Sequence, residues 1–271
     1  MKIFKNKLNL RKEISKDNCL SFVPTMGGLH EGHLSLIKKA KKRKCKICVS
    51  IFINPTQFNK KNDYNNYPRN IKSDIKKLKK LKISYLYLPT YKDIYSFKIK
   101  NKIYKDKFSS QLCGKFRKGH FEGVLNVVNR FLEIIQPKYV YLGIKDYQQL
   151  VLIERHIKKN EIKTKVVKCK TIREKNGVAC STRNINLNND QFIIASNIYK
   201  YLSNFKKKIK KNYKLFKLNK IKKDLILLGA TKIDYLENLN INKFTKKKNL
   251  KKKFKLFFAY YIKNIRLIDN I

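Results

Sequence analysis

The chain has 271 residues with 42% hydrophobic content, enough for one large domain or for two domains that each bury a core, and we expect two. No stretch approaches the roughly 18 consecutive apolar residues of a membrane span, and residues 1–17 lack the apolar core of a secretory signal. These features exclude an integral membrane protein and predict a cytoplasmic one.

The formal net charge of +48 would ordinarily indicate a nucleic-acid or anionic-membrane partner. Only 9 of the 66 basic residues are arginine, however, and arginine is the usual side chain for bidentate phosphate and base contacts. Abundant Lys, Asn and Ile, scarce Gly and no Trp favour mutational pressure from an AT-rich genome. We expect lysine spread over the surface and no specific nucleic acid. An RNA-binding protein that kept a nucleotide-binding fold is the alternative class.

Six cysteines are scattered through the chain, at Cys19, Cys45, Cys48, Cys113, Cys169 and Cys180. Nothing in their spacing predicts a disulfide framework. The pair at 45 and 48 has redox or half-zinc spacing, but it runs into an apolar strand and has no second pair. We expect small buried or edge residues here.

Apolar runs of strand length occur at residues 20–23, 46–53, 83–88 and 139–143, separated by segments with helical periodicity. One such segment covers 71–81 and another 121–135, which Pro137 ends. Each stripe of apolar residues is typical of a core face. The alternation predicts an α/β fold, a Rossmann-like parallel sheet with flanking helices.

The pattern changes near residue 185. Two helices are expected near 190–205 and 215–228, followed by strand-like runs at 235–239, 254–261 and 265–268 that could form an antiparallel sheet. We predict a catalytic domain over 1–184 and a smaller α+β C-terminal domain over 185–271. The lysine runs 206–208 and 246–253 are interpreted as solvated faces or loops.

Residues 22–33, FVPTMGGLHEGH, combine a strand end, a glycine turn and a helix start. Pro24 is expected to stop the strand, and Gly27 and Gly28 to let the backbone turn tightly. His30 and His33 then share one face of a helix N-terminus, which suits a phosphate. Two solvent-facing histidines would be the plain alternative. Zinc is a further one, but no nearby Cys or carboxylate pair completes the ligands.

Residues 24–33, PTMGGLHEGH, resemble the signature of the pantothenate synthetase family in the nucleotidyltransferase superfamily. The resemblance implies ATP-dependent condensation of pantoate with β-alanine to pantothenate, AMP and pyrophosphate through pantoyl adenylate. It also implies Mg²⁺ with the ATP and a homodimer. Another adenylyl or cytidylyl transferase of the superfamily is the alternative within enzymes.

Further segments carry the same resemblance. Residues 50–58, SIFINPTQF, end a strand and match a string whose glutamine, here Gln57, binds pantoate beside the β-alanine site. Residues 143–149, GIKDYQQ, match the family's Gly-Glu-Lys-Asp-x-Gln-Gln with Ile144 in place of glutamate, and provide Lys145 and Gln149. Asp146 could cap the helix that follows. Generic nucleotidyltransferases do not need both glutamine blocks.

Residues 176–184, NGVACSTRN, form a turn and a cationic loop that resembles the family's Met-Ser-Ser-Arg-Asn loop. By the resemblance, His33, His30, Lys145 and Arg183 are catalytic and Gln57 and Gln149 bind pantoate or β-alanine. The ATP contacts it assigns are Met26, Gly27, Gly28, Leu29, His30, Glu31, Gly32, His33, Gly143, Ile144, Lys145, Asp146, Ile172, Cys180, Ser181, Thr182 and Arg183.

Two segments give weaker candidates. Residues 67–74 match a family segment associated with magnesium, so Asp74 is a tentative Mg²⁺ ligand, although Ser73 stands where the family is often acidic. Helix capping by Asn70 and Asp74 is the alternative. Residues 116–123 resemble Arg-Pro-Gly-His-Phe with Lys118 for the proline, which makes Arg117 and His120 candidates of second rank.

Overall fold

A computed structural model describes residues 1–59, 61–104, 106–211, 217–241 and 254–271. By its internal contacts the chain divides into two compact units, Met1–Thr171 and Ile172–Ile271. Within the described residues, none of the helices is long and apolar enough to span a bilayer.

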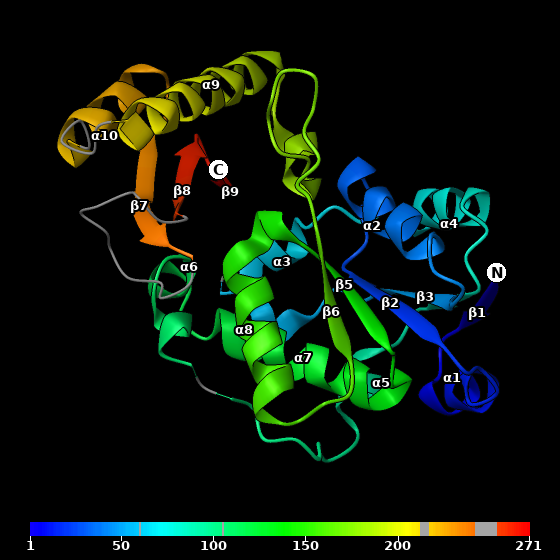
Figure 1. Ribbon diagram of the computed structural model, residues 1–271. Helices are drawn as coiled ribbons and strands as arrows, with labels where there is room; N and C mark the ends of the chain where they lie inside the picture. The colour runs from blue at the N-terminus through cyan, green and yellow to red at the C-terminus, as the bar shows by residue number, and fades with distance from the viewer. Residues whose placement is uncertain (60, 105, 212–216, 242–253) are drawn as a thin grey trace. The chain divides into compact units, whose positions relative to one another are not determined.

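The first unit is built on a six-stranded parallel sheet (Figure 1). Its strands run β1-β4-β3-β2-β5-β6 across the sheet. Their bounds are β1 Lys2–Phe4, β2 Leu20–Thr25, β3 Lys46–Ile51, β4 Tyr85–Tyr87, β5 Tyr139–Gly143 and β6 Lys165–Cys169. Since the chain leaves β2 toward β3 on one side and later enters β5 on the other, the order reverses between β2 and β5. Open α/β sheets bind ligands beyond the strand ends at such a point.

Helices cover both faces of this sheet (Figure 1). Their bounds, with the short 3-10 turns, are α1 Lys7–Ile14, α2 Glu31–Lys41, η1 Pro55–Gln57, α3 Lys61–Asn65, α4 Ile71–Lys80, α5 Tyr91–Tyr95, η2 Lys107–Ser110, α6 Cys113–Phe116, α7 His120–Ile135, η3 Ile144–Asp146 and α8 Tyr147–Lys159. Helix α7 ends before Pro137, as predicted.

Alternating side chains of the strands enter two different cores. On one face, Val23 and Val49 pack with Ile37 of α2 and Leu78 of α4, all fully buried. On the other face, Phe22 packs against Phe131 of α7, with ring centroids 5.5 Å apart. Because successive strand residues point to opposite faces, a continuous apolar run is what a sheet covered on both sides requires.

The sequence placed the four central strands correctly, but it missed β1 and β6 and ended β2 too early. Pro24 lies inside β2, where it is paired in register with Ser50 of β3. The ladder between β2 and β5 includes only Ser21 and Phe22, so at Pro24 the chain pairs with β3 alone. A residue without an N–H is tolerated where one side of the ladder has ended.

The expectation of no disulfide was also wrong. Cys19 and Cys45 form a disulfide, with Cα atoms 4.8 Å apart. The parallel register pairs Leu20 with Lys46, which brings the residues just before these two strands side by side. The expectation of small buried residues holds for Cys48, which is a buried free thiol.

Among its described residues, the second unit has two α-helices and an antiparallel sheet of order β7-β8-β9, as predicted. The elements are η4 Thr182–Asn186, α9 Asn189–Lys211, α10 Leu218–Leu227, β7 Lys232–Asn240, β8 Phe254–Ile262 and β9 Ile265–Asn270. Fully buried Ala195 and Ile198 of α9 pack in one core with Leu225 of α10 and Phe258 of β8. The predicted lysine run 246–253 lies outside the described residues.

Candidate active site

The histidine pair lies directly after the carboxyl end of β2. His30 is the N-cap of α2 and His33 stands at the third position of the helix, with the imidazole ring centroids 4.0 Å apart. The backbone reaches this position through Gly27 and Gly28, whose φ angles are +81° and +60°. Left-handed φ angles at two consecutive positions favour glycine, so the turn that the sequence predicted is present.

Backbone donors fix which ring nitrogen of each histidine carries the proton. The Gly32 N–H donates to His30 Nδ1 at 3.1 Å, and the His30 N–H lies 3.5 Å from His33 Nδ1. A nitrogen that accepts a hydrogen bond is unprotonated, so each neutral ring has its proton on Nε2. Both histidines are thereby set up as Nε2–H donors.

The electrostatic surroundings also keep the two rings neutral. Burial, followed by the charges of Lys145 and Lys77, lowers the pKa of His30 to about 4, against an opposing effect of Asp146. Burial, followed by His30, Lys145 and Lys77, lowers the pKa of His33 well below its usual value. The two adjacent imidazoles, whose pKa values are lowered by burial and by the charges of Lys145 and Lys77, therefore form a neutral donor pair at pH 7.

Lys145 follows β5, the strand next to β2, and its charge acts on both histidines. Its Nζ lies 3.6 Å from Asp146 Oδ1, and its side chain is 17% exposed. Asp146 precedes α8 without a side-chain capping hydrogen bond, so the prediction of a cap there was wrong. A Cβ added at Gly143 would meet no atom within 4 Å, which leaves open space at the strand end.

Gln57 follows β3, the other neighbour of β2, and contacts the histidine loop. Its Nε2 donates to Met26 Sδ at 2.6 Å, and the side chain is 8% exposed. Asn54, fully buried, donates to Gln57 Oε1 at 3.4 Å and to Gly123 O at 3.2 Å. The structure thus brings together the predicted residues of the ends of β2, β3 and β5.

Arg117 and His120 hold the backbone of Gln57. His120 Nδ1 and the Gln57 carbonyl oxygen are 2.7 Å apart, Arg117 Nη2 donates to the same oxygen at 3.3 Å, and the two side chains contact each other at 3.0 Å. Gly123 lies on α7, the helix that begins at His120. There is no room for a Cβ at this position, because it would lie 2.4 Å from Thr56 O. These contacts indicate that Arg117 and His120 position Gln57.

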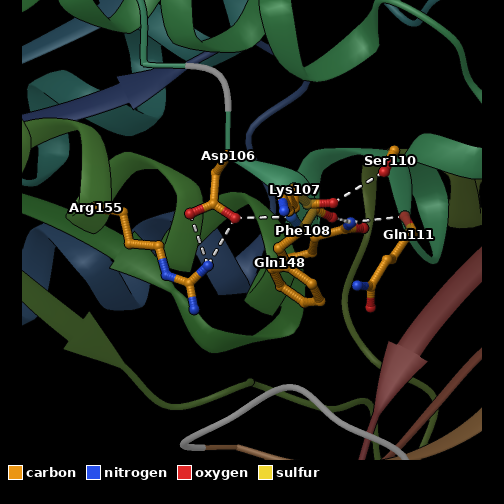
Figure 2. A network of polar contacts seen from close by, with 7 residues as sticks. All are labelled: Asp106, Lys107, Phe108, Ser110, Gln111, Gln148 and Arg155. Carbon is orange, nitrogen blue, oxygen red and sulfur yellow. Dashed lines mark hydrogen bonds and ion pairs between the residues drawn. The ribbon is translucent and has the colours of Figure 1, made fainter.

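Gln148 was not predicted as a site residue, and its amide is fully engaged (Figure 2). Its Nε2 donates to Phe108 O and Gln111 O, both at 2.7 Å, and its Oε1 accepts from Cys113 N at 3.1 Å. In the same network Arg155 Nη1 lies 2.7 Å from both carboxylate oxygens of Asp106. Gln148 therefore anchors the segment before α7. Its neighbour Gln149 is half-buried, and its substrate-binding role stays a prediction.

Asp74 does not have the surroundings of a magnesium ligand. Its carboxylate is 1% exposed, and each oxygen accepts a backbone N–H at 2.8 Å, from Gly28 and from Leu29. Among the described residues, no group of three or more His, Cys, Asp or Glu side chains is placed to hold a metal ion. The predicted cap of α4 is confirmed at Asn70, whose side chain accepts from Ser73 N.

The remaining candidates lie in the second unit. Residues 172–180 form a short hairpin in which Gly177 has a φ angle of +94° and Cys180 N donates to Ile172 O at 3.0 Å. Ser181 then caps η4, accepting from Arg183 N at 3.3 Å. The predicted turn is present, and Thr182 and Cys180 are buried.

A parallel sheet with a glycine turn, two histidines at a helix start and a lysine after the neighbouring strand is an arrangement expected of a nucleotide-binding α/β enzyme. Comparison with known proteins makes this specific. A profile of the family described as pantoate-beta-alanine ligase matches residues 2–271.

A pantothenate synthetase of Flavobacterium psychrophilum is 39% identical over 269 residues, 98% of this chain and 95% of that protein. A pantoate-beta-alanine ligase crystal structure from Francisella tularensis, complexed with beta-gamma ATP and beta-alanine, has a TM-score of 0.85 at 38% identity and covers 100% of this chain and 97% of its own. The Thermus thermophilus pantothenate synthetase has a TM-score of 0.92 at 28% identity, covering 100% and 99%. The chain belongs to the pantoate–β-alanine ligase family and is a ligase.

Proposed function

We propose that the residues at the carboxyl edge of the parallel sheet carry out the reaction of this family in a fixed division of roles. The reaction condenses pantoate with β-alanine. The pantoate carboxylate attacks the α-phosphorus of ATP, pyrophosphate leaves, and the β-alanine amine then displaces AMP from pantoyl adenylate. Such a phosphoryl transfer requires positioning and charge stabilisation from the protein, with little covalent work.

His30 and His33 are proposed to donate their Nε2–H groups to the phosphate oxygens of ATP. The observation that carries this role is the engagement of both Nδ1 atoms by backbone N–H groups, which leaves Nε2–H as the donor of each ring. Negative charge grows on the leaving pyrophosphate as the bond to the α-phosphorus breaks. Preorganised donors stabilise such charge without reorganising during the reaction.

Lys145 is proposed to balance the charge of the leaving pyrophosphate, because its ammonium group acts on both imidazoles and its side chain is only 17% exposed. Ser181 and Arg183 are proposed to bind the β- and γ-phosphates, and the backbone around Ile172 the adenine. Gln57 and Gln149 are proposed to orient pantoate through its hydroxyl and carboxylate groups. Gln57 fits this role because Asn54 holds its side chain while Arg117 and His120 hold its carbonyl oxygen.

Magnesium is proposed to arrive with ATP as its counter-ion. Both oxygens of Asp74 accept backbone N–H groups, so its surroundings do not fit a resident metal ion. None of the residue roles proposed here depends on one. A homodimer in the cytoplasm is proposed from the family resemblance, and gel filtration with light scattering would measure the oligomeric state directly.

The reaction is tested by ATP–pyrophosphate exchange. Exchange is expected with ATP and pantoate, no exchange without pantoate, and conversion to pantothenate and AMP when β-alanine is added. Exchange that does not depend on pantoate would refute the assignment. Salt-sensitive RNA retention with no ATP turnover would support the alternative of an RNA-binding protein.

A further inference from the structure

Two side chains of helix α4 grip the loop that leads into the histidine pair. The Asp74 carboxylate accepts from Gly28 N and Leu29 N, each at 2.8 Å. Lys77, one turn later on the same face of the helix, donates its Nζ to Leu29 O at 2.5 Å. The N–H and the carbonyl of Leu29 are therefore both held by α4, one residue before the N-cap His30.

This arrangement, called here the α4 clamp, sets the direction of the loop backbone. Leu29 itself is buried, at 2% exposure, so its side chain and both of its backbone polar groups are fixed. A Cβ at Gly27 would lie 3.2 Å from Asp74 Oδ2 and 3.1 Å from Ile51, which shows how closely the loop approaches the clamp. Movement of the clamp would thus be transmitted directly to His30.

The contacts of Asp74 in the α4 clamp differ from those of a magnesium ligand. A magnesium ion is held by carboxylates that can reach it together with water and phosphate oxygens. Here a single carboxylate is 1% exposed, both of its oxygens accept backbone N–H groups, and its neighbour is Ser73 where a second acid would be needed. The negative charge is satisfied by hydrogen bonds to the loop.

We propose that Asp74 and Lys77 are positioning residues for His30 and His33, and that Asp74 is not a magnesium ligand. The proposal rests on the roles given above to the two histidines. It extends them by identifying what holds the rings in place.

The test compares four variants with the wild-type chain: Asp74→Asn, Asp74→Ala, Lys77→Met and Lys77→Arg. Lys76→Met is the matched control, because Lys76 is an exposed lysine on the same helix. Each variant is measured for kcat, for the Mg²⁺ concentration that gives half-maximal pyrophosphate exchange, and for the imidazole Cε1–H resonances. The chain has only four histidines, and His156, which contacts Asn129 and Tyr104, serves as the internal reference.

The clamp predicts a loss of kcat without a change in metal dependence. Asp74→Ala lowers kcat by about a hundredfold and Asp74→Asn by about tenfold, the range for a displaced catalytic group and a lost charged hydrogen bond. The half-maximal Mg²⁺ concentration stays within about twofold, as expected when no metal ligand is removed. The His30 and His33 resonances move, whereas that of His156 does not.

Lys77→Met is expected to behave like Asp74→Asn, and Lys77→Arg to recover most of the activity because it keeps a donor for Leu29 O. Lys77→Met should also raise the pKa of His30, since it removes one of the positive charges that lower it. If Lys77 served only to fill space, methionine would replace it as well as arginine does. Lys76→Met should match the wild type in every measurement.

Two results would overturn the proposal. The first is a tenfold or larger rise in the half-maximal Mg²⁺ concentration of Asp74→Asn, with kcat restored at saturating Mg²⁺. The second is a normal kcat with unmoved histidine resonances. Should Asp74→Ala fail to fold, Asp74→Asn and the two Lys77 variants decide by the same criteria. The histidine resonances are recorded without turnover. They would therefore still test the α4 clamp if the chain did not catalyse the proposed reaction.

Discussion

Two loops that carry proposed phosphate-binding residues are each held by one buried carboxylate, but in different ways. Asp74 bonds the backbone of residues 28 and 29 directly, beside His30. Asp269 of the second unit instead receives the Arg173 guanidinium, at 2.6 and 3.2 Å, at the base of the hairpin that leads to Ser181. In the first loop the carboxylate bonds the backbone next to His30, whereas in the second it acts through Arg173, which also donates to Gly177 O at the hairpin turn.

The two loops should therefore respond differently to mutation. A displaced His30 would lose its alignment with the transition state, whereas a weakened contact in the hairpin before Ser181 would mainly lower the affinity for ATP. We therefore expect changes in the first loop to act on kcat and changes at the anchor of the second to act on the KM for ATP.

The largest expected effect comes from His33. His33→Ala removes one preorganised donor and should lower turnover at least about a hundredfold. Pantoate-dependent pyrophosphate exchange is the measurement, with circular dichroism to verify the fold. Near-normal turnover in a folded variant would remove His33 from its proposed role.

The disulfide between Cys19 and Cys45 should affect stability and not catalysis. It closes a separation of 26 residues that includes β2, the histidine loop and α2. Replacing both cysteines by serine is expected to lower the unfolding free energy by about 3 kcal/mol, the scale for a loop of this length. Urea unfolding measures this, and wild-type protein in reducing agent should match the double variant. An unchanged midpoint in both would contradict the expectation.

The anchor of the second loop should give a smaller effect on activity. Arg173 is 21% exposed and Asp269 8% in their ion pair, and Arg173 also donates to Gly177 O at 3.1 Å. Arg173→Gln is expected to raise the KM for ATP by about tenfold, the scale of one charged hydrogen bond, with a much smaller change in kcat. If kcat fell as far as in His33→Ala, the distinction between the two loops would be lost.

The smallest expected effect is a pH dependence of stability caused by the histidine pair. The pKa of His30 is lowered from 6.5 to about 4 in the folded chain, so between these values the unfolded state binds the extra proton. Stability from this group is present above pH 6.5 and is lost as pH falls toward 4, by about 1 kcal/mol between pH 7.5 and 5 after allowance for solvent screening. Urea unfolding of the wild type and of His30→Gln at both pH values would show it. An equal pH dependence in the two proteins would contradict it.

The sequence predicted the central strands and the long helices because their apolar residues follow a regular period over many positions. It missed β1 and β6 because both are edge strands, and exposed lysines such as Lys165 and Lys168 interrupt their apolar pattern. In the second unit the order of helices and antiparallel strands followed from the same periodicity. Strand ends were less certain, as Pro24 shows.

The glycine turn and the paired histidines at a helix start could be predicted, because the motif that forms them is contiguous in sequence. Asp74, Arg117 and His120 were named as candidates through the family resemblance, but their contacts with the loop backbone were not predicted. Asp74 is 46 residues from Gly28, Arg117 is 60 from Gln57 and Gln148 is 40 from Phe108. Such partners are set by which strand ends meet, and no local pattern encodes that. The disulfide was missed for the same reason, since it depends on the register of β2 with β3.

The protonation of the two imidazoles tests the central claim most directly. Nitrogen-15 NMR of histidine-labelled protein at pH 7 reports the state of each ring nitrogen without any need for turnover. The predicted result is a neutral ring at both His30 and His33, with Nε2 protonated and Nδ1 bare. An imidazolium at either position, or a proton on Nδ1, would contradict the claim that this loop presents a pair of neutral donors.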